Sequence, residues 1–298
     1  MYNILIWGTA MEYDQYLAVI KYYEGKKLFQ VVGVTSNDNY YNYLDGYPFI
    51  PKRDLVKVAY DWIIICASKE RTADIRKEAI SMGISEDILF SAYILLQPEF
   101  DFEKYIRLSE SKISIFSCNC WGGQAYKRFG LKVRSPFYNM YEHVSEFIPF
   151  LKDAKEILSS EKLQFCTTEY NDDLLFHYPV YDLAGLKLHM NNYPNPEEAE
   201  RKWYERCARI NWDNVFVMIY ADDVRCIEDF SRLPYQKKIC FTTKETDIPN
   251  TCCLPIEKVC PDRKFGQIVI GSVIGRYKLY DVMELLLSGR IVKDCRIG

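Results

Sequence analysis

Short apolar runs, each followed by a turn and then by helical spacing, recur through the first third of the chain and constrain its fold most strongly. Residues 3–7 (NILIW) end at Gly8, apolar positions at helical spacing follow over 16–23, and a second apolar run covers 29–35. A strand, a turn, a helix and a second strand form a right-handed βαβ unit with parallel strands. The pattern predicts a doubly wound, Rossmann-like α/β sheet over residues 1–105.

The same alternation continues to the end of this first domain, and the length of the chain indicates a second domain. Residues 60–67 (YDWIIICA) predict another buried strand, and residues 88–90 resume strand character. Residues 98–111 are polar with helical character, which is typical of a connector. A chain of 298 residues fits two domains. We therefore expect a second α/β domain over residues 106–298.

The second domain mixes apolar strands with amphipathic helices, and its sheet order stays open. A confident helix covers residues 196–208, where Pro196 and two glutamates suit the first turn. Another helix should begin at Tyr141 or Glu142. Further strands are predicted over residues 113–116, 174–180, 186–190, 214–220 and 238–243, with a short helix over 124–129, an apolar run over 267–270 and a last helix over 279–287.

Composition and charge narrow the classes of function. Hydrophobic residues make up 49% and charged residues 27%, and the net charge of −3 comes from well-mixed signs, so a nucleic-acid partner is not expected. The first residues have no signal-peptide pattern, and no apolar stretch of about 18 residues could span a membrane. Eleven cysteines without a secretion signal should stay reduced, which favours a cytoplasmic protein.

The carboxyl ends of the first sheet would form its binding site. Asp38 stands where an acidic residue accepts hydrogen bonds from a ribose, but the glycine fingerprint is incomplete because Ala10 and Tyr13 replace two glycines. Three possibilities stay open: a nicotinamide dinucleotide, another nucleotide or nucleotide-sugar, or a structural sheet without a ligand. This half resembles the Rossmann-like module that begins many sugar-modifying proteins. The candidate cofactor-binding residues are Gly8, Thr9, Ala10, Asp38 and Ser68.

A cysteine-containing turn opens the second domain. Cys118 and Cys120 lie between an apolar strand and a helical segment, within SCNCWGG. Unpaired backbone N–H groups and the positive end of a helix dipole would favour a thiolate there, and a thiolate is a nucleophile. The alternative is that both cysteines are ordinary core thiols and that Gly122 and Gly123 only permit the turn.

A general base that titrates near neutral pH must be one of three histidines. His143 stands at a helix start and should be on the surface, whereas His177 and His189 fall on predicted strands. We prefer His189 because a polar loop follows it. A core imidazole satisfied by hydrogen bonds is the alternative for both strand residues.

Two pairs of charged residues suggest ligands for ions. Asp222 and Asp223 follow an apolar strand, as do the acidic residues with which many glycosyltransferases hold a metal and a sugar diphosphate; capping of the next turn is the alternative. Arg206 and Arg209 share one helical face and could clamp a phosphate or carboxylate. The alternative for both arginines is dipole complementation or plain surface solvation.

Residues 111–245 resemble a family of bacterial proteins associated with exopolysaccharide biosynthesis. The resemblance rests on SCNCWGG, on Ser135-Pro136-Phe137, on His189 and on the helical run EEAERKWYERCARINWDNVF. It implies a role in the assembly of surface glycans, with a small molecule or a glycan as substrate.

The cysteine turn, the later Pro-Phe and the downstream histidine are also similar to proteins classed as papain-like cysteine peptidases. This similarity implies Cys120 as nucleophile, His189 as its base and Asp222 as the group that orients the imidazole. The leading hypothesis is therefore an accessory enzyme of surface-glycan synthesis, a Cys/His-dependent acyl transferase or hydrolase. A metal-dependent glycosyltransferase and a non-catalytic nucleotide-sugar-binding protein are the alternatives, and the oligomeric state stays open.

Overall fold

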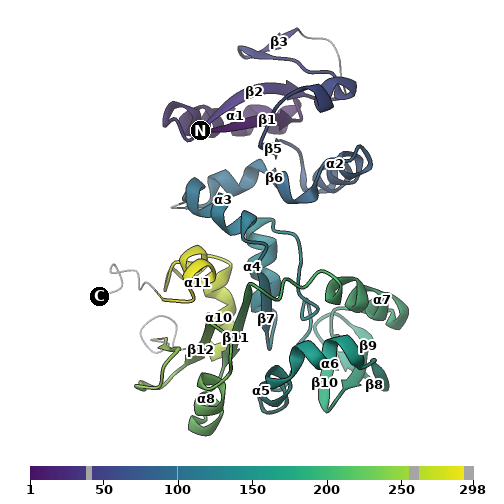
Figure 1. The fold of residues 1–298 in the computed structure, drawn as a ribbon, viewed down its shortest axis with the longest axis vertical. Helices are drawn as coiled ribbons and strands as arrows, with labels where there is room; N and C mark the ends of the chain where they lie inside the picture. Colours follow the sequence, from purple (N-terminus) through teal and green to yellow (C-terminus); the bar gives the residue numbers. More distant parts are fainter. Residues whose placement is uncertain (38–41, 99, 255–261, 292–298) are drawn as a thin grey trace. The chain divides into compact units, whose positions relative to one another are not determined.

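The computed structural model describes residues 1–37, 42–98, 100–254 and 262–291. The chain divides into two compact units (Figure 1). Unit 1 comprises Met1–Glu110 and Phe129–Lys132, and unit 2 comprises Ser111–Arg128 and Val133–Gly298. The sequence placed the division after residue 105. Among the described residues, no helix combines the length and apolar character that a bilayer crossing requires.

Unit 1 is built on a four-stranded parallel sheet, which confirms the predicted α/β class. Its strand order is β2-β1-β5-β6, so the order reverses at β1. Strand β5 is fully buried because it is a continuous apolar run, as expected for a parallel sheet with both faces covered. The strands are β1 (Tyr2–Trp7), β2 (Phe29–Thr35), β5 (Trp62–Ile65) and β6 (Leu89–Ser91), with a small hairpin of β3 (Tyr43–Leu44) and β4 (Tyr47–Pro48).

The helices of unit 1 follow its strands in the alternating order that the sequence predicts. They are α1 (Met11–Gly25), α2 (Lys69–Ser81) and α3 (Phe102–Glu110), with short 3-10 helices η1 (Lys52–Lys57), η2 (Glu86–Ile88) and η3 (Ala92–Leu96). Helix α3 falls where the polar connector was predicted, yet it buries one face in the core. Phe102 packs on Phe29 with ring centroids 5.1 Å apart. The sequence interpretation overlooked this apolar face.

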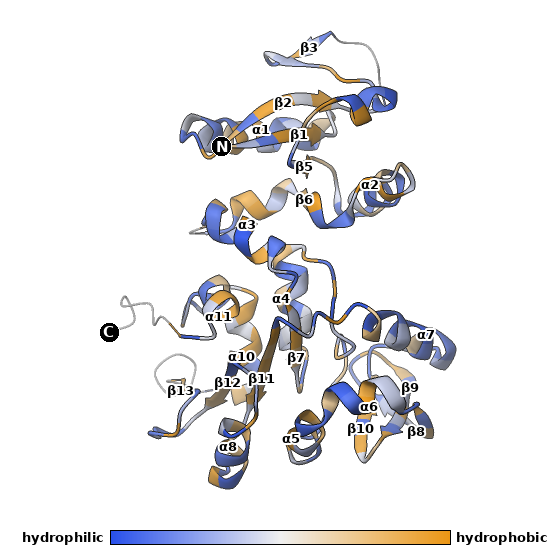
Figure 2. Cartoon of the chain, in the orientation of Figure 1, coloured by the Kyte–Doolittle hydropathy of each residue, from blue (hydrophilic) through white to orange (hydrophobic). Residues whose placement is uncertain are grey.

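Unit 2 contains a second four-stranded parallel sheet, in the order β13-β12-β11-β7. Its central strand β11 is largely hydrophobic, whereas the helix α7 is largely hydrophilic (Figure 2). The strands are β7 (Ser114–Ser117), β11 (Val215–Tyr220), β12 (Lys237–Thr242) and β13 (Thr251–Cys253), and α8 (Val224–Ser231), α10 (Phe265–Val273) and α11 (Val282–Ser288) follow β11 in the chain.

A long insertion between the neighbouring strands β7 and β11 carries a separate antiparallel sheet, in the order β10-β9-β8. Its elements are α4 (Trp121–Phe129), α5 (Val144–Lys152), α6 (Ala154–Ser160), β8 (Gln164–Asn171), β9 (Phe176–Leu183), β10 (Leu186–His189) and α7 (Pro196–Cys207). The helix predicted from Tyr141 or Glu142 begins only at Val144, because Tyr141 forms a β-bridge with His189 instead.

Phe137, from the Ser-Pro-Phe motif, anchors this insertion to the core of unit 2. Its ring makes edge contacts with Phe116 of β7 at 5.1 Å, with Phe147 of α5 at 5.1 Å and with Trp203 of α7 at 5.6 Å between centroids. Such aromatic pairs contribute beyond the area they bury. Phe137 is therefore held between β7, α5 and α7. The segment that follows it carries Tyr141 and Glu142.

Candidate functional site

In unit 1, two of the residues predicted to bind a cofactor have structural roles. Gly8 has φ +116°, and a Cβ there would lie 2.2 Å from the carbonyl oxygen of Cys66, so glycine is needed for the approach of two backbones. Ser68 is the N-cap of α2, where its Oγ accepts a hydrogen bond from Arg71 N at 3.4 Å.

Two of the other three residues of that predicted cofactor site, Thr9 and Ala10, lie within the described residues. Thr9 is half-buried, and Ala10 is the exposed N-cap of α1 without a side-chain cap. Asp38 lies outside the described residues. A nucleotide or nucleotide-sugar at this edge of the sheet therefore stays a prediction.

In unit 2, side chains of the turn between β7 and α4 hydrogen-bond to backbone groups of the same turn. The Oδ1 atom of Asn119 accepts from Trp121 N at 2.8 Å, and Ser117 Oγ accepts from Gly122 N at 3.0 Å. Ser117 in turn donates to the carbonyl of Asn119 at 2.8 Å. Two of the first N–H groups of α4, those of Trp121 and Gly122, which the sequence analysis expected to be unpaired, are thus satisfied by the turn itself.

The two thiols of this turn have raised pKa values, contrary to the expectation of a favoured thiolate. Cys118 is 2% exposed, and desolvation raises its pKa to about 12, so it is a core thiol as the alternative interpretation held. Cys120 is half-buried, and desolvation raises its pKa, with a further contribution from the charge of Glu142. Burial is therefore the largest influence on the pKa of Cys120.

Glu142 is a buried acid that the sequence analysis did not single out. Its backbone N donates to the carbonyl of Cys118 at 3.1 Å, its residue is 4% exposed, and neither carboxyl oxygen has a hydrogen-bond partner among the described residues. Burial raises its pKa well above the ordinary value. Nδ2 of Asn119 is likewise buried without a partner in the described part of the chain. Two unsatisfied polar groups thus adjoin Cys120.

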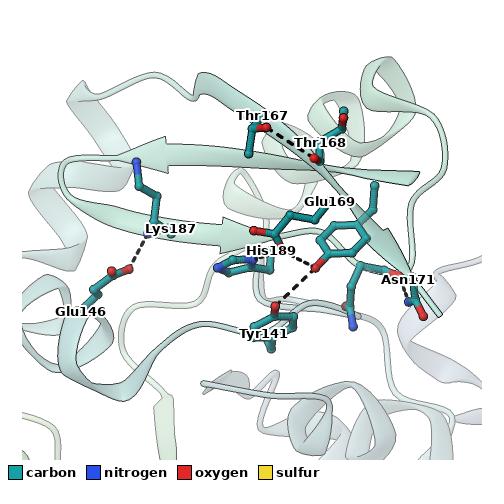
Figure 3. Close-up of polar contacts among 10 residues, drawn as sticks. Tyr141, Glu146, Thr167, Thr168, Glu169, Asn171, Lys187 and His189 are labelled. Atoms are coloured by element: carbon teal, nitrogen blue, oxygen red, sulfur yellow. Dashed lines mark hydrogen bonds and ion pairs between the residues drawn. The ribbon is translucent and has the colours of Figure 1, made fainter. Parts of the chain in front are cut away.

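His189 belongs to a compact polar cluster on the antiparallel sheet (Figure 3). Its Nδ1 lies 3.2 Å from Oε2 of Glu169, the same oxygen that accepts from Tyr178 Oη at 2.5 Å. Tyr141 stacks on the imidazole with centroids 4.4 Å apart and an interplanar angle of 10°, and its Oη lies 3.3 Å from Tyr178 Oη. Main-chain hydrogen bonds in both directions, each 3.2 Å, join Tyr141 to His189. The imidazole is fixed on one ring face and at Nδ1.

This arrangement orients the imidazole for proton transfer. The hydrogen bond from Tyr178 lowers the pKa of Glu169, as does the neighbouring His189, so this carboxylate stays ionised and can only accept a hydrogen bond. We therefore assign the proton of neutral His189 to Nδ1. Nε2 hydrogen-bonds to no described residue and is not among the buried polar atoms that lack a partner, so solvent reaches it. An imidazole held in this way resembles a general base.

The structure does not join the predicted nucleophile to any histidine by a hydrogen bond. Within the described ranges, Cys120 forms none with His143, His177 or His189. His143 is exposed, as predicted, with its ring centroid 5.4 Å from that of His189, and His177 is exposed against Tyr170. The thiol and the imidazole are linked instead through consecutive residues, Glu142 at the cysteine turn and Tyr141 at His189.

Asp222 and Asp223, which follow β11, both accept hydrogen bonds from backbone N–H groups. Oδ1 of Asp222 accepts from Thr242 Oγ1 at 2.8 Å and from Thr243 N at 2.7 Å, whereas the hydrogen-bonded carboxylate partner of His189 is Glu169. Asp223 caps α8, as the structural alternative predicted. The orienting role implied for Asp222 stays a prediction without support in this geometry. No group of three or more potential metal ligands is found in the part of the chain that the structure describes.

Arg206, in α7, and Arg209, two residues beyond the end of that helix, have different environments. Arg209 is on the exposed side and pairs with Glu205, with Nη2 and Oε2 3.7 Å apart. Arg206 is 8% exposed and lies between two tyrosine rings. The shared clamp that their spacing suggested is therefore not formed, and only Arg206 faces the interior.

Two family descriptions match the chain. A domain of unknown function (DUF1919) matches residues 92–285, and a C2185-like N-terminal family matches residues 1–90. The chain is also similar to an uncharacterized protein of Haemophilus influenzae, with 31% identity over 141 residues, which is 46% of this chain. That alignment spans 65% of the relative's length, slightly less than two thirds.

Proposed function

We propose that this chain, which belongs to the family of the domain of unknown function DUF1919, is a hydrolase or acyl transferase with His189 as its general base. The observation that supports this proposal is the orientation of the imidazole, with Nδ1 on Glu169 at 3.2 Å and Nε2 open to solvent. Glu169 would stabilise the imidazolium that forms when Nε2 takes a proton.

Cys120 is the proposed nucleophile. Its raised pKa leaves the thiol protonated at neutral pH, so attack requires a base to remove that proton. In the first step Sγ bonds to the acyl carbon and its proton passes by way of His189 to the leaving group, which departs as the thioester forms. In the second step, water or an acceptor hydroxyl attacks the thioester and gives its proton to His189. The C–S bond breaks, the acyl group leaves as a carboxylic acid or an ester, and the proton on His189 returns to Sγ to regenerate the thiol.

The proposed substrate class is an acylated precursor of a surface glycan. This part of the proposal is supported only by the resemblance of residues 111–245 to proteins of exopolysaccharide biosynthesis and of the first unit to modules of sugar-modifying proteins. We propose cytoplasmic action on a small molecule or glycan, and a nucleotide-sugar at unit 1 stays a prediction from the sequence.

Hydrolysis of 4-nitrophenyl acetate by the full chain tests the chemistry without knowledge of the natural substrate. His189→Gln and Cys120→Ala should each lower kcat/KM by roughly 10²- to 10⁴-fold, because each removes a group that takes part in proton transfer or bond formation. Glu169→Gln should lower it less and shift the acidic limb of the pH profile. The matched control is His177→Gln, an exposed histidine on the same sheet, which should leave the rate unchanged.

Cys120→Ala and His189→Gln together distinguish the role of nucleophile from the role of general base. If Cys120→Ala keeps full activity while His189→Gln loses it, water is the direct nucleophile and the thioester step is wrong. If His189→Gln hydrolyses the ester as fast as the wild type, the general-base proposal itself fails. Circular dichroism of each variant would establish that a loss of rate is not a loss of fold.

A further inference from the structure

Arg206 is held rigidly by aromatic side chains. Its Cζ lies 4.7 Å from the ring centroid of Tyr138 and 5.7 Å from that of Tyr193. Its Nη1 donates to Tyr193 Oη and, at 3.4 Å, to the carbonyl oxygen of Tyr138. Cation–π contact and hydrogen bonding together leave the guanidinium little rotational freedom.

The positive charge of Arg206 has no carboxylate partner among the described residues. The neighbouring basic residues behave differently, since Arg201, Lys202 and Arg209 all pair with Glu205. A buried charge without a counter-charge is costly. A bound anion would remove that cost.

One edge of the guanidinium is available to such an anion. Nε and Nη2 form no hydrogen bond with a described residue, and neither is among the buried polar atoms that lack a partner. Solvent therefore reaches Nε and Nη2, although Arg206 as a whole is only 8% exposed. The Nε–Nη2 edge presents two parallel N–H groups, which match two oxygens of one carboxylate or phosphate.

We propose that Arg206 anchors an anionic ligand, binding a carboxylate or phosphate group of it through Nε and Nη2. The site adjoins the cysteine turn, because a Cβ at Gly123 in the first turn of α4 would lie 3.6 Å from Cδ2 of Tyr138. Anion binding by Arg206 needs no catalytic step, so it can be tested independently of the roles proposed for Cys120 and His189.

Thermal unfolding of the full chain at constant ionic strength tests this proposal with inorganic phosphate, glucuronate and glucose as probes. For the wild type, phosphate, glucuronate or both should raise Tm at about 10 mM, and uncharged glucose should not. A response to phosphate alone identifies a phosphate ligand, and a response to glucuronate alone identifies a carboxylate ligand.

Variants of Arg206 and Arg209 show which arginine binds the anion. Arg206→Gln should weaken anion binding by roughly 10- to 100-fold, and Arg206→Lys should restore only part of it because an ammonium lacks the planar edge. Arg209→Gln is the matched control, since it removes an exposed arginine two residues beyond the end of the same helix, and binding should not change.

A binding constant for Arg206→Gln equal to that of the wild type would overturn the proposal, as would a wild-type Tm that responds to neither anion. If Arg206→Gln does not fold, Tyr193→Phe replaces it as the test. That variant keeps the ring but removes the hydroxyl that fixes Nη1, and a several-fold loss of anion affinity is expected. Unchanged affinity in Tyr193→Phe would then count against the preorganised site.

Discussion

The carboxyl ends of the two parallel sheets differ in how their polar groups are satisfied. In unit 1, Gly8 permits a close backbone approach to Cys66 and Ser68 caps α2, so both residues are used by the fold, although the buried hydroxyl of Thr35 at the end of β2 has no partner among the described residues. In unit 2, the turn after β7 satisfies its own backbone but adjoins the buried carboxyl of Glu142 and the amide Nδ2 of Asn119, which have no partners in the described residues.

This difference indicates where function is concentrated. A buried polar group without a hydrogen bond costs about 1–3 kcal/mol, and a carboxyl that can ionise costs more than the hydroxyl of Thr35, so the cysteine turn of unit 2 loses more stability in this way than the edge of the first sheet. Such a cost is typical of functional sites and not of the scaffold around them. We therefore place the chemistry in unit 2 and expect the residues at the edge of the first sheet to behave as structural residues.

The largest effect should come from Gly8→Ala, which tests whether the first sheet is structural at this point. The added Cβ would lie 2.2 Å from a backbone oxygen at φ +116°, so unit 1 should lose at least about 3 kcal/mol of its free energy of unfolding. Urea denaturation would measure this loss. Gly25→Ala in α1 is the control, because nothing lies within 4 Å of its Cβ position. An unchanged midpoint for Gly8→Ala would break the comparison.

A smaller, pH-dependent effect is expected for Glu142→Gln. The folded-state pKa of Glu142 is raised above the ordinary 4.5, so its contribution to stability is fully present below pH 4.5 and is lost as the pH rises through the folded pKa. The variant cannot ionise, so it should match the wild type near pH 4 and exceed its free energy of unfolding by about 1–3 kcal/mol at pH 8.

Urea titrations at several pH values would measure this difference, with the exposed Glu161→Gln as control. A variant that is less stable than the wild type at pH 8 would mean that the ionised Glu142 is well satisfied in the folded protein. The contrast between the two sheets would then disappear.

The smallest effect should come from Ser68→Ala, which removes the cap of α2. Loss of this cap should lower the free energy of unfolding by about 0.5–1 kcal/mol, since the hydrogen bond to Arg71 N is long at 3.4 Å. Ser68→Thr keeps the hydroxyl and should lose less. If Ser68→Ala instead abolishes retention of a nucleotide-sugar in a binding assay, then unit 1 carries a ligand site after all.

The sequence predicts the parallel strands well because buried strands are continuous apolar runs, as in β5 and β11. It misses β8, which is almost wholly exposed and shows no apolar pattern, and Glu169 is missed with it. Glu142 resembled an acidic residue at a helix start, and only its main-chain hydrogen bond to the carbonyl of Cys118 places it beside the cysteines. Partners far apart in sequence leave no local periodicity, so His189 could be singled out but not its carboxylate.

Tyr141 and Glu142 are neighbours in the chain, yet one stacks on the imidazole and the other lies at the thiols. A ligand that displaces this dipeptide must perturb both environments together. NMR titration of the His189 ring should therefore report occupancy at the cysteine turn, even for molecules that never touch the ring.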